Sequence, residues 1–500
     1  MTSSSPSTTT PSTSPEFPIQ WRESTPRDEF LASCWSHNHN HRRATSARVP
    51  RAVVHATSPS HVVEAVKLAG KLGCRVSVRS GGHSWAGWSV RDDAVLIDLG
   101  ALPGGKHSSS SSSGATTAGL DYDDRTKIVS APPSATGRMV NGFLEKHGRM
   151  FAGGHCPDVG LGGFLLQGGM GWNCKNWGWA CESIIGLDAV TAEGKEVYAS
   201  KGENADLFWA ARGAGPGFPA IVTRFYLMTR PLPKMSQSIY FWPKSIILSH
   251  CFSPLWKICP DADPDTEIVC LGQYIPGYDE PIVFANFLSF KPTQAEAEAA
   301  LRPLHDHPGR PPNALKESFF AQPTSLPGQY VPQEAANPPD HRYCSENAYI
   351  RNNEADVPAV LEKAFTTVPN RKTFALYFSM NPTSRRGHYS AGVDDVGSMA
   401  FSMQSDHYFA LYSIWEDEKD DEKFVGWTHD IMKDVERHAE GSYLGDADFQ
   451  LRRTKFWRDE NAARLMEIRR KWDPDARICG YLDEGDRSGA EGLRNEFEWK

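Results

Sequence analysis

The chain has 500 residues, of which 40% are hydrophobic and 23% charged, so it is long enough for two domains with separate cores. Its net charge of −8 excludes the basic field that a nucleic-acid partner would require. No stretch of roughly 18 residues is free of charged or turn-forming residues, so we expect no membrane-spanning helix and no membrane partner.

The N-terminus is expected to form a disordered tail over residues 1–20. Residues 1–15 are rich in Ser, Thr and Pro and cannot bury apolar surface. They also lack the basic start and apolar stretch of a secretory signal. The 10 cysteines contain no CxxC pair and do not suggest a disulfide framework. We therefore expect a cytoplasmic protein, although a secreted chain that had lost its leader would start in the same way.

Strands and helices alternate in the first part of the chain, over residues 45–232. Ala52–Val54, Arg75–Arg79 and Val95–Leu99 are apolar, β-branched runs typical of strands. Between the first two runs, apolar residues recur at helical spacing after Ser60, a candidate N-cap. The pattern predicts a strand–helix–strand unit.

A flexible surface insertion is expected at 103–120, where serine is unbroken over 108–113. After it, Ile185–Val190 and Lys195–Tyr198 flank a Glu-Gly pair and predict a hairpin. Ala220–Met228 predicts a further strand.

The middle of the chain, residues 235–437, alternates strand-like runs with amphipathic helices. Ala295–Leu304 predicts a helix and His407–Trp415 a strand, with proline-rich loops around 308–340. We expect a separate substrate domain here, followed by a C-terminal segment over 440–490.

Three glycine-rich stretches in the first half carry the chemistry. In the first, Arg79–Gly87, a strand runs into two glycines and then polar residues. Consecutive backbone N–H groups in such a turn can bind an anion, and glycine lets a phosphate approach the backbone. Taken alone, this loop is equally a simple turn with a surface histidine.

The second stretch has eight glycines between Gly153 and Gly171, which suits backbone laid against a flat ligand. Gly160, Gly162 and Gly163 match half of a dinucleotide-binding GxGxxG motif. Because no clean strand precedes them and no acidic residue follows at the required distance, a nicotinamide site is disfavoured. The third stretch, Trp209–Pro219, is a helix and a glycine turn leading into a strand.

In this order and spacing, the three stretches resemble the FAD-binding domain of the vanillyl-alcohol oxidase and p-cresol methylhydroxylase flavoproteins. Within that group they resemble the berberine bridge enzyme branch. The resemblance covers about 45–230 and returns at 440–483, where Asn461 and the pair Asp473-Pro474 match the family's C-terminal segment. It implies an α+β fold with an FAD-binding domain made from both ends of the chain. It also implies a central substrate domain in which helices cover an antiparallel sheet.

The resemblance further implies covalent FAD with two attachment points. His83 matches the histidine that binds the flavin 8α-methyl carbon, and Cys156 matches the cysteine that bonds to flavin C6. Two such bonds would fix the ring and make it a better hydride acceptor. From the residues alone, a turn histidine and a buried thiol remain alternatives. The other expected FAD contacts are Arg79, Ser80, Gly81, Gly82, Ser84, Gly153, Val159, Gly160, Gly162, Gly163, Gly168, Gly169, Gly171, Ile221, Val222 and Asn461.

On the substrate side, the chain departs from the family pattern. The branch typically has Tyr-x-Asn-Tyr-x-Asp, whose second tyrosine serves as base, whereas here Gly445 and Asp446 follow Tyr443. A buried carboxylate with a raised pKa can take a proton, so Asp446 is the candidate base, with a structural role as the alternative. Tyr443 is a candidate for orienting substrate or flavin. Tyr408 and Tyr412 share one face of a strand that would cover the flavin, with aromatic packing as the alternative.

The sequence thus predicts an FAD-linked oxidoreductase of secondary metabolism. It would transfer a hydride from a small organic substrate to FAD, and the resemblance implies that dioxygen then reoxidises the flavin and forms hydrogen peroxide. Three alternatives stay open: a non-redox cyclase or isomerase on the same fold, an extracellular carbohydrate oxidase, and a binding protein without turnover. We expect no metal site, because the alternating His37, His39 and His41 have no acidic or Cys partner nearby.

Overall fold

The structure is a computed structural model that describes most of the chain. The expected insertion 103–120 lies largely outside the described residues, as do His37, His39 and residues 1–16. The described residues are 17–36, 40–43, 48–104, 119–245, 259, 262–311, 315, 319–351, 357–380, 398–449, 451–480 and 495–499.

The end of the expected disordered tail is a strand, so that prediction is wrong for its last residues. Ile19–Trp21 forms β1 and pairs antiparallel with β2 (Ala52–His55). The physical reason is local apolar content, because Phe17 and Ile19 pack on the core beneath helix α2 (Pro59–Leu72).

The first sheet has the strand order β1-β2-β4-β3, in which β4 (Val95–Asp98) pairs in parallel with β2 and β3 (Val76–Arg79). Helix α2 is the predicted crossover. It begins after Ser58 rather than Ser60, because Pro59 fits the first helical turn, where no backbone N–H is needed. Helix α1 (Arg27–Trp35) precedes this unit.

A second, five-stranded sheet is entirely antiparallel and contains the predicted hairpin and the predicted strand at Ala220–Met228. The start of its strand β10 lines the cavity described below. Its strands, in spatial order, are β5 (Asp121–Asp123), β6 (Ile128–Ala131), β10 (Ala220–Met228), β8 (Ile184–Thr191) and β9 (Glu196–Ser200). Around it lie α3 (Gly137–Glu145), β7 (Arg149–Met150), α4 (Leu161–Leu166), α5 (Cys174–Trp177), α6 (Ala205–Ala211) and β11 (Arg230–Pro231).

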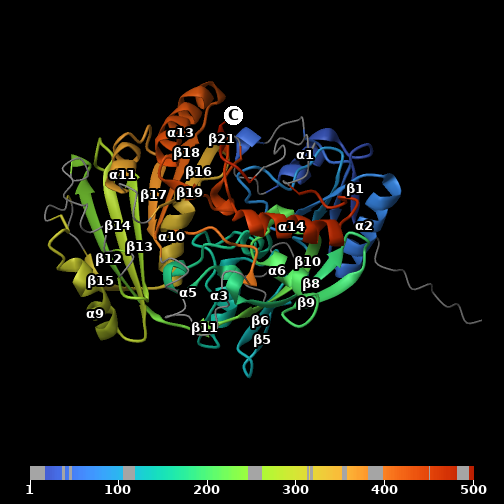
Figure 1. The fold of residues 1–500 in the computed structure, drawn as a ribbon, viewed down its shortest axis with the longest axis horizontal. Coiled ribbons are helices and arrows are strands. Elements are labelled where there is room, and N and C mark those ends of the chain that lie inside the picture. Colours follow the sequence, from blue (N-terminus) through green and yellow to red (C-terminus); the bar gives the residue numbers. More distant parts are fainter. Residues whose placement is uncertain are drawn as a thin grey trace, which may run out of the picture.

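The third sheet has eight antiparallel strands and stands at the left of Figure 1. Helices α9, α11 and α13 pack on one face, as the amphipathic patterns predict. The strands, in spatial order, are β15 (Phe319–Thr324), β12 (Lys234–Pro243), β14 (Ile282–Lys291), β13 (Thr266–Gln273), β17 (Phe374–Ser379), β18 (His407–Trp415), β16 (Arg342–Ile350) and β19 (Ala439–Gly441). The helices are α9 (Gln294–His305), α11 (Val357–Thr366) and α13 (Asp421–Glu436).

The two faces of this sheet differ because side chains alternate along each strand. On β17, Ala375 and Tyr377 face the helices, whereas Phe374, Leu376 and Phe378 face an internal cavity. On that inner side lies a helix that the sequence did not predict, α10 (Leu326–Ala336), within the stretch expected to be proline-rich loop. Ser325 caps it by accepting the backbone N–H of Gly328.

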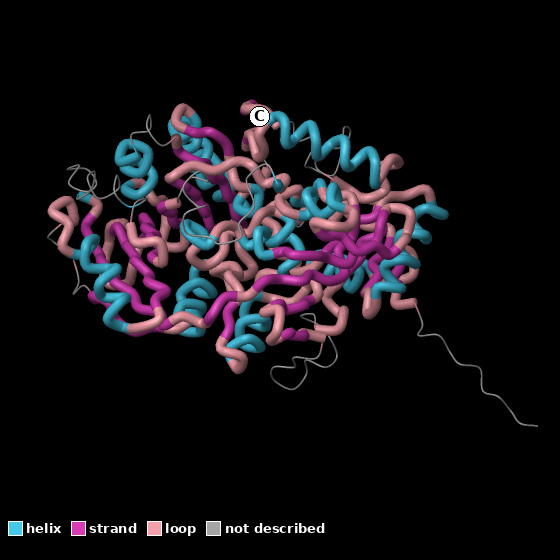
Figure 2. The backbone as a smooth tube through the Cα atoms, turned by 60° about the horizontal axis from the view of Figure 1, so that its bottom comes forward, coloured by secondary structure: helices cyan, strands magenta, loops and turns pink. Residues whose placement is uncertain are grey.

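The C-terminal segment crosses back to the first two sheets, as Figure 1 shows for α14 (Asp459–Trp472). The Trp457 indole N–H donates to the Gly213 carbonyl at 2.9 Å, and the Cys479 N–H donates to the Val76 carbonyl at 2.9 Å. A final short pair joins β20 (Arg452–Arg453) to β21 (Glu498–Trp499). Figure 2 shows the strands gathered in two regions with loops between them.

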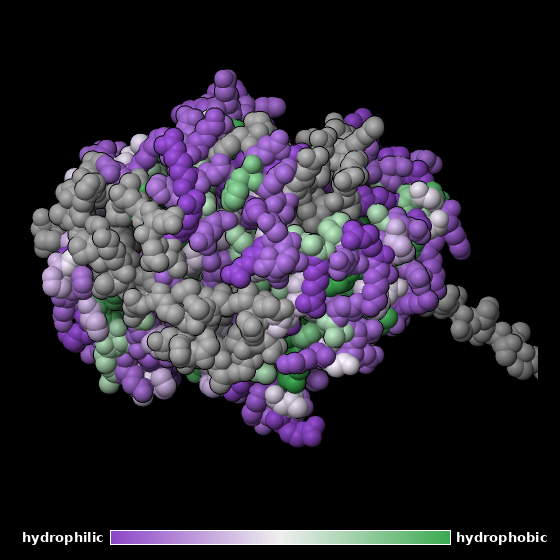
Figure 3. All heavy atoms as spheres, in the orientation of Figure 1, coloured by the Kyte–Doolittle hydropathy of each residue, from purple (hydrophilic) through white to green (hydrophobic). Residues whose placement is uncertain are grey.

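On the face shown in Figure 3, the described residues present mainly hydrophilic side chains, with apolar ones in small groups. Within the described residues, no helix combines the length and apolar character needed to cross a membrane.

Candidate active site

A cavity of about 750 Å³ lies between the first two sheets and the inner face of the third. This volume is within the range of small-molecule sites. The walls come from segments far apart in the sequence. They are the first two glycine-rich stretches, which we call the two glycine-rich loops, the start of β10, helix α10, the inner face of β13 and β17, and the segment Tyr443–Asp446. Most of the sequence-predicted site residues therefore meet in one place.

The two glycine-rich loops touch each other through their backbones. A Cβ atom on Gly81 would lie 2.6 Å from the Gly160 nitrogen, and a Cβ on Gly160 would lie 2.8 Å from the Gly81 nitrogen. Neither position can hold a side chain. Gly82 has a φ of +78°, which also favours glycine. This contact brings His83 and Cys156, one from each loop, to the same cavity.

Arg79 lines the cavity, but its guanidinium bonds to protein groups. It donates to the carbonyls of Ser33 and Cys34 at 2.8 and 2.7 Å and to the carboxylate of Asp98 at 2.8 Å. Burial opposes ionisation of Asp98, but the His55 and Arg79 hydrogen bonds hold its pKa well below the usual range. Arg79 therefore fixes the start of the loop, and its charge is already matched.

Cys156 contacts the residue that follows the unpredicted helix α10. The Asn337 side-chain amide lies just beyond the C-terminus of α10 and donates to the Cys156 sulfur at 3.5 Å. Burial raises the pKa of the Cys156 thiol to about 12, and the charges of Asp446 and Asp158 add to the effect. The thiol is thus protonated at neutral pH, and bond formation at this sulfur requires a proton acceptor.

Five predicted FAD contacts lie outside the cavity lining. A Cβ on Gly171 would lie 2.1 Å from the Ala152 carbonyl oxygen, so this glycine allows two chain segments to approach each other. Asn461 donates to the Met399 carbonyl at 3.1 Å and ties α14 to the loop before β18. These residues support the walls without reaching the cavity. The five are Gly153, Gly168, Gly169, Gly171 and Asn461.

Asp446 and two tyrosines form a polar cluster on the substrate side. The Tyr408 hydroxyl donates to Asp446 Oδ2 at 2.6 Å, and Tyr412 also hydrogen-bonds this carboxylate. Burial raises the pKa of Asp446, and the two tyrosines together with His155 partly offset the rise. Burial and the Asp446 charge raise the pKa values of both phenols, so these hydroxyls act as donors. Tyr412 and Asp446 line the cavity, whereas Tyr408 acts through Asp446.

Tyr443 lines the cavity, and the position of its ring requires a glycine at residue 445. Its hydroxyl accepts the Met170 N–H at 3.2 Å, and its ring lies 5.1 Å from the Trp179 ring. A Cβ on Gly445 would lie 2.6 Å from the Tyr443 ring. The ring folds back over the glycine, so an asparagine at 445 would not fit.

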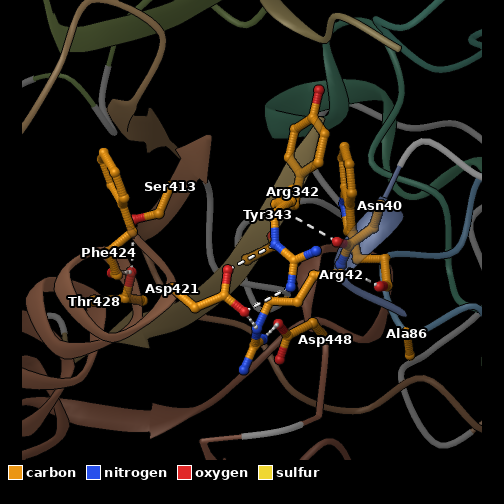
Figure 4. A network of polar contacts seen from close by, with 12 residues as sticks. Asn40, Arg42, Ala86, Arg342, Tyr343, Ser413, Asp421, Phe424, Thr428 and Asp448 are labelled. Carbon is orange, nitrogen blue, oxygen red and sulfur yellow. Dashed lines mark hydrogen bonds and ion pairs between the residues drawn. The ribbon is translucent and has the colours of Figure 1, made fainter. Parts of the chain in front are cut away.

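The segment that holds Asp446 is fixed by hydrogen bonds to strand β16. The Ser345 hydroxyl donates to the Asp446 carbonyl at 2.6 Å, and the Asp448 N–H donates to the Ser345 carbonyl at 3.0 Å. Figure 4 shows Arg42 between the carboxylates of Asp421 and Asp448, with 3.7 Å to each. This arrangement ties the segment to both β16 and the N-terminal part of the chain.

Several polar residues of the cavity were not predicted, among them a histidine and a glutamate that pair with each other. His155 Nε2 lies 3.0 Å from Glu267 Oε1, and both residues line the cavity. The signals for them in the sequence are weak: His155 is one position before Cys156, and Glu267 is a lone carboxylate in an otherwise apolar strand.

A cavity walled by glycine-rich loops, with a histidine, a cysteine and a buried carboxylate in its lining, is suited to a flavin-dependent oxidoreductase. The comparisons agree. Residues 50–200 match the family model described as an FAD binding domain. The FAD-linked oxidoreductase ptmO of Penicillium ochrochloron is 38% identical over 437 residues, which are 87% of this chain and 91% of that protein. The chain belongs to the FAD-linked oxidoreductases, and FAD is its cofactor.

Solved structures share the fold over nearly the whole chain. The BBE-like 1 protein of Physcomitrella patens matches with a TM-score of 0.73 and 17% identity, covering 96% of this chain and 97% of that one. The carbohydrate oxidase of Microdochium nivale matches with a TM-score of 0.74 and 21% identity, covering 96% and 98%. The predicted α+β fold and the resemblance to the berberine bridge enzyme branch are confirmed.

Proposed function

We propose that this protein is an oxidase that holds FAD through bonds at His83 and Cys156 and oxidises a small, largely apolar molecule at a carbon bearing an O–H or N–H group. The observation that carries the proposal is the buried Asp446, which lines the same cavity as His83 and Cys156 and accepts a hydrogen bond from the Tyr408 hydroxyl at 2.6 Å. When bound, FAD supplies a two-electron acceptor that dioxygen can reoxidise, giving hydrogen peroxide.

Asp446 accepts the proton of the substrate's O–H or N–H group. Burial raises its pKa, which makes the carboxylate a stronger base than an exposed aspartate. Tyr408 donates to one carboxylate oxygen and so fixes the orientation of the group. Tyr412 and Tyr443, which also line the cavity, hold the substrate against the cofactor.

The bonds at His83 and Cys156 fix the position of FAD, so the rest of the cavity stays open to substrate. Their side chains are suited to this role, because imidazole nitrogen and thiol sulfur are both nucleophiles. The remaining wall residues offer backbone and small polar groups to the cofactor. These are Ser80, Gly81, Gly82, Ser84, Val159, Gly160, Gly162, Gly163, Ile221 and Val222.

The substrate side of the cavity favours an apolar skeleton over a sugar. Polar groups such as Gln273, Asn286 and Gln329 also line this side, but apolar side chains outnumber them. A carbohydrate would therefore leave part of its hydroxyl groups against hydrocarbon, and each buried hydroxyl without a partner costs on the order of 1–3 kcal/mol. An apolar substrate with one polar handle at Asp446 has no such cost, as expected for an intermediate of secondary metabolism. The apolar lining residues are Phe241, Val269, Leu271, Ile275, Phe284, Phe374, Leu376 and Phe378.

Anaerobic mixing tests the proposal. We expect an apolar terpenoid alcohol such as farnesol to bleach the flavin absorbance faster than cellobiose does. The Asp446→Asn variant should bleach about 10²- to 10⁴-fold more slowly, while Asp459→Asn, at the exposed start of α14, should match the wild type. Product formed without bleaching would identify a non-redox cyclase or isomerase. Faster bleaching by cellobiose would identify a carbohydrate oxidase.

A further inference from the structure

The inner face of the third sheet carries a row of four side chains that leads from Asn286 to the partner of Asp446. Asn286 on β14 pairs with Val269 on β13. Val269 in turn pairs with Phe378 on β17, which pairs with Tyr408 on β18, and these four strands are neighbours in the sheet (Figure 1). Residues directly opposite each other on neighbouring antiparallel strands share one face. The Tyr408 hydroxyl, at the end of the row, donates to Asp446.

The row is polar at its two ends and apolar in between. Neighbouring strands are about 4.8 Å apart, so three strand spacings place Asn286 about 14 Å from Tyr408 across the sheet. Val269 and Phe378 lie between them and line the cavity, as Asn286 does. A ligand that follows the row therefore meets hydrocarbon in the middle and a polar group at either end.

Asn286 belongs to a chain of three carboxamides that joins the sheet to helix α10. Its Nδ2 donates to Gln329 Oε1 at 3.3 Å, and Gln329 Nε2 donates to Gln237 Oε1 at 2.7 Å. Gln329 also donates to Thr324 Oγ1 at 2.9 Å, and only 7% of the residue is exposed. Both Asn286 and Gln329 line the cavity. A buried partner thus holds the Asn286 amide in place.

One atom of this carboxamide chain is left over. Among the described residues, nothing forms a hydrogen bond with Asn286 Oδ1, which is buried. Buried polar atoms in native proteins nearly always have a partner, so an orphan atom on a residue that lines a cavity indicates a polar group bound there. A hydroxyl group suits this position, because it both donates and accepts and can pair with either atom of the amide.

An anionic group is disfavoured at this end of the cavity. The described lining residues include no lysine, and their single arginine, Arg79, belongs to the first sheet and is already paired with Asp98. A carboxylate or phosphate beside Asn286 would be buried without a counter-charge, which is costly. The ligand group at Asn286 is therefore uncharged.

Resting on the proposed role of Asp446 as base, we propose that the Asn286–Gln329 pair binds a second hydroxyl group at the far end of the substrate. The substrate is then an elongated hydrocarbon skeleton with a hydroxyl near each end, separated by about the three-strand span of the row. The first hydroxyl gives its proton to Asp446 while its carbon gives a hydride to FAD. The second supplies the hydrogen bond that Asn286 lacks, so Asn286 determines which alcohols bind well.

Binding of two pairs of alcohols tests the proposal. Farnesol and 12-hydroxyfarnesol differ by a hydroxyl at the far end of a long chain, and geraniol and 8-hydroxygeraniol differ in the same way on a chain too short to span the row. Dissociation constants are measured by equilibrium dialysis against Asp446→Asn holoprotein, the parent for this test, in which oxidation is slow. The added hydroxyl should tighten binding roughly 5- to 10-fold in the farnesol pair. It should give no gain in the geraniol pair, because that hydroxyl cannot reach Asn286.

A substitution of similar volume separates binding from packing. In Asn286→Leu, made in the same parent, the ratio of the two dissociation constants in the farnesol pair should fall to about one. Gln20→Leu removes a carboxamide on β1, outside the cavity lining, and should keep the ratio of the parent. A purely structural role of the Asn286–Gln329 pair would weaken both ligands together and leave the ratio unchanged.

Four results would overturn the proposal: a ratio near one in the parent, no saturable binding of 12-hydroxyfarnesol, an equal gain in the geraniol pair, or a retained ratio in folded Asn286→Leu. If that variant does not fold, the parent measurements with the two pairs decide. The proposed function would fail in a different way, through a flavin that no alcohol bleaches.

Discussion

The two sides of the cavity shift the pKa of a buried aspartate in opposite directions. On the side of the first sheet, Asp98 lies against the Arg79 guanidinium, and its pKa is held well below the usual range. On the substrate side, Asp446 is hydrogen-bonded by the phenols of Tyr408 and Tyr412, and burial raises its pKa. The carboxylate of Asp98, which is paired with an arginine, fixes a loop in place. The carboxylate of Asp446, which is bonded by phenols, is available for proton transfer. We call the side of the first sheet, with Arg79, Asp98 and the first two glycine-rich loops, the structural wall. We call the substrate side, with Asp446 and its tyrosines, the reactive wall.

The largest effect should come from the two covalent attachment points on the structural wall. After denaturation, His83→Ala and Cys156→Ala should each keep yellow colour with the chain, because one bond remains. The double variant should lose the flavin completely to the filtrate, as measured by absorbance after ultrafiltration. Release from either single variant would mean that only one bond forms.

Removing the charge of Asp98 should be the next largest change. In Asp98→Asn the buried Arg79, whose side chain is 2% exposed, loses its carboxylate partner. Breaking a buried pair in this way costs about 3–5 kcal/mol. The folded-state pKa of Asp98 is lowered, so its stabilising contribution is present above the unfolded-state pKa and disappears as pH falls. Urea unfolding should therefore show a large loss at pH 7 and a smaller one near pH 3; a loss independent of pH would contradict this role.

The close contact of the two glycine-rich loops predicts a smaller loss of folding free energy when one of its glycines is replaced. Gly160→Ala places a methyl group 2.8 Å from the Gly81 backbone and should cost about 1–3 kcal/mol with reduced FAD content. Gly142→Ala is the matched control, because its Cβ meets nothing within 4 Å and it lies within α3. There, alanine should stabilise the protein by about 0.5–1 kcal/mol. Equal effects of the two variants would argue against the loop contact.

The structural wall could be predicted from sequence because its signals are local. Glycines, a histidine and a cysteine stand in two short stretches, and the strands Ala220–Met228 and His407–Trp415 have the bounds that their apolar runs predict. Period-2 alternation also placed Tyr408 and Tyr412 on one face. It did not reveal that only Tyr412 reaches the cavity, because that depends on where Asp446 packs.

The rest of the cavity was only partly predictable because tertiary packing assembles it. Helix α10 was missed because prolines at 327 and 332 suggested a loop, although the first is tolerated in the opening turn of the helix. His155 and Glu267 are 112 positions apart, and no local pattern pairs them. Gly153, Gly168, Gly169, Gly171 and Asn461, which were expected at FAD, lie outside the cavity lining and make close contacts within the chain. Glycine content indicates close approach of backbone but not what approaches it.

The smallest expected effect is the change in stability caused by Asp446→Asn. Its sign is opposite to that of the change caused by Asp98→Asn. The raised pKa of Asp446 means that the folded state binds its proton more tightly than the unfolded state, so stability falls as pH rises from the unfolded-state pKa through the folded one. Asp446→Asn removes this ionisation and should stabilise the protein by about 0.5–1 kcal/mol at pH 8, with little change near pH 4. Thermal unfolding at the two pH values measures the difference. A variant less stable than the wild type at pH 8 would assign Asp446 to the same class as Asp98, as part of the framework that holds the cavity in shape.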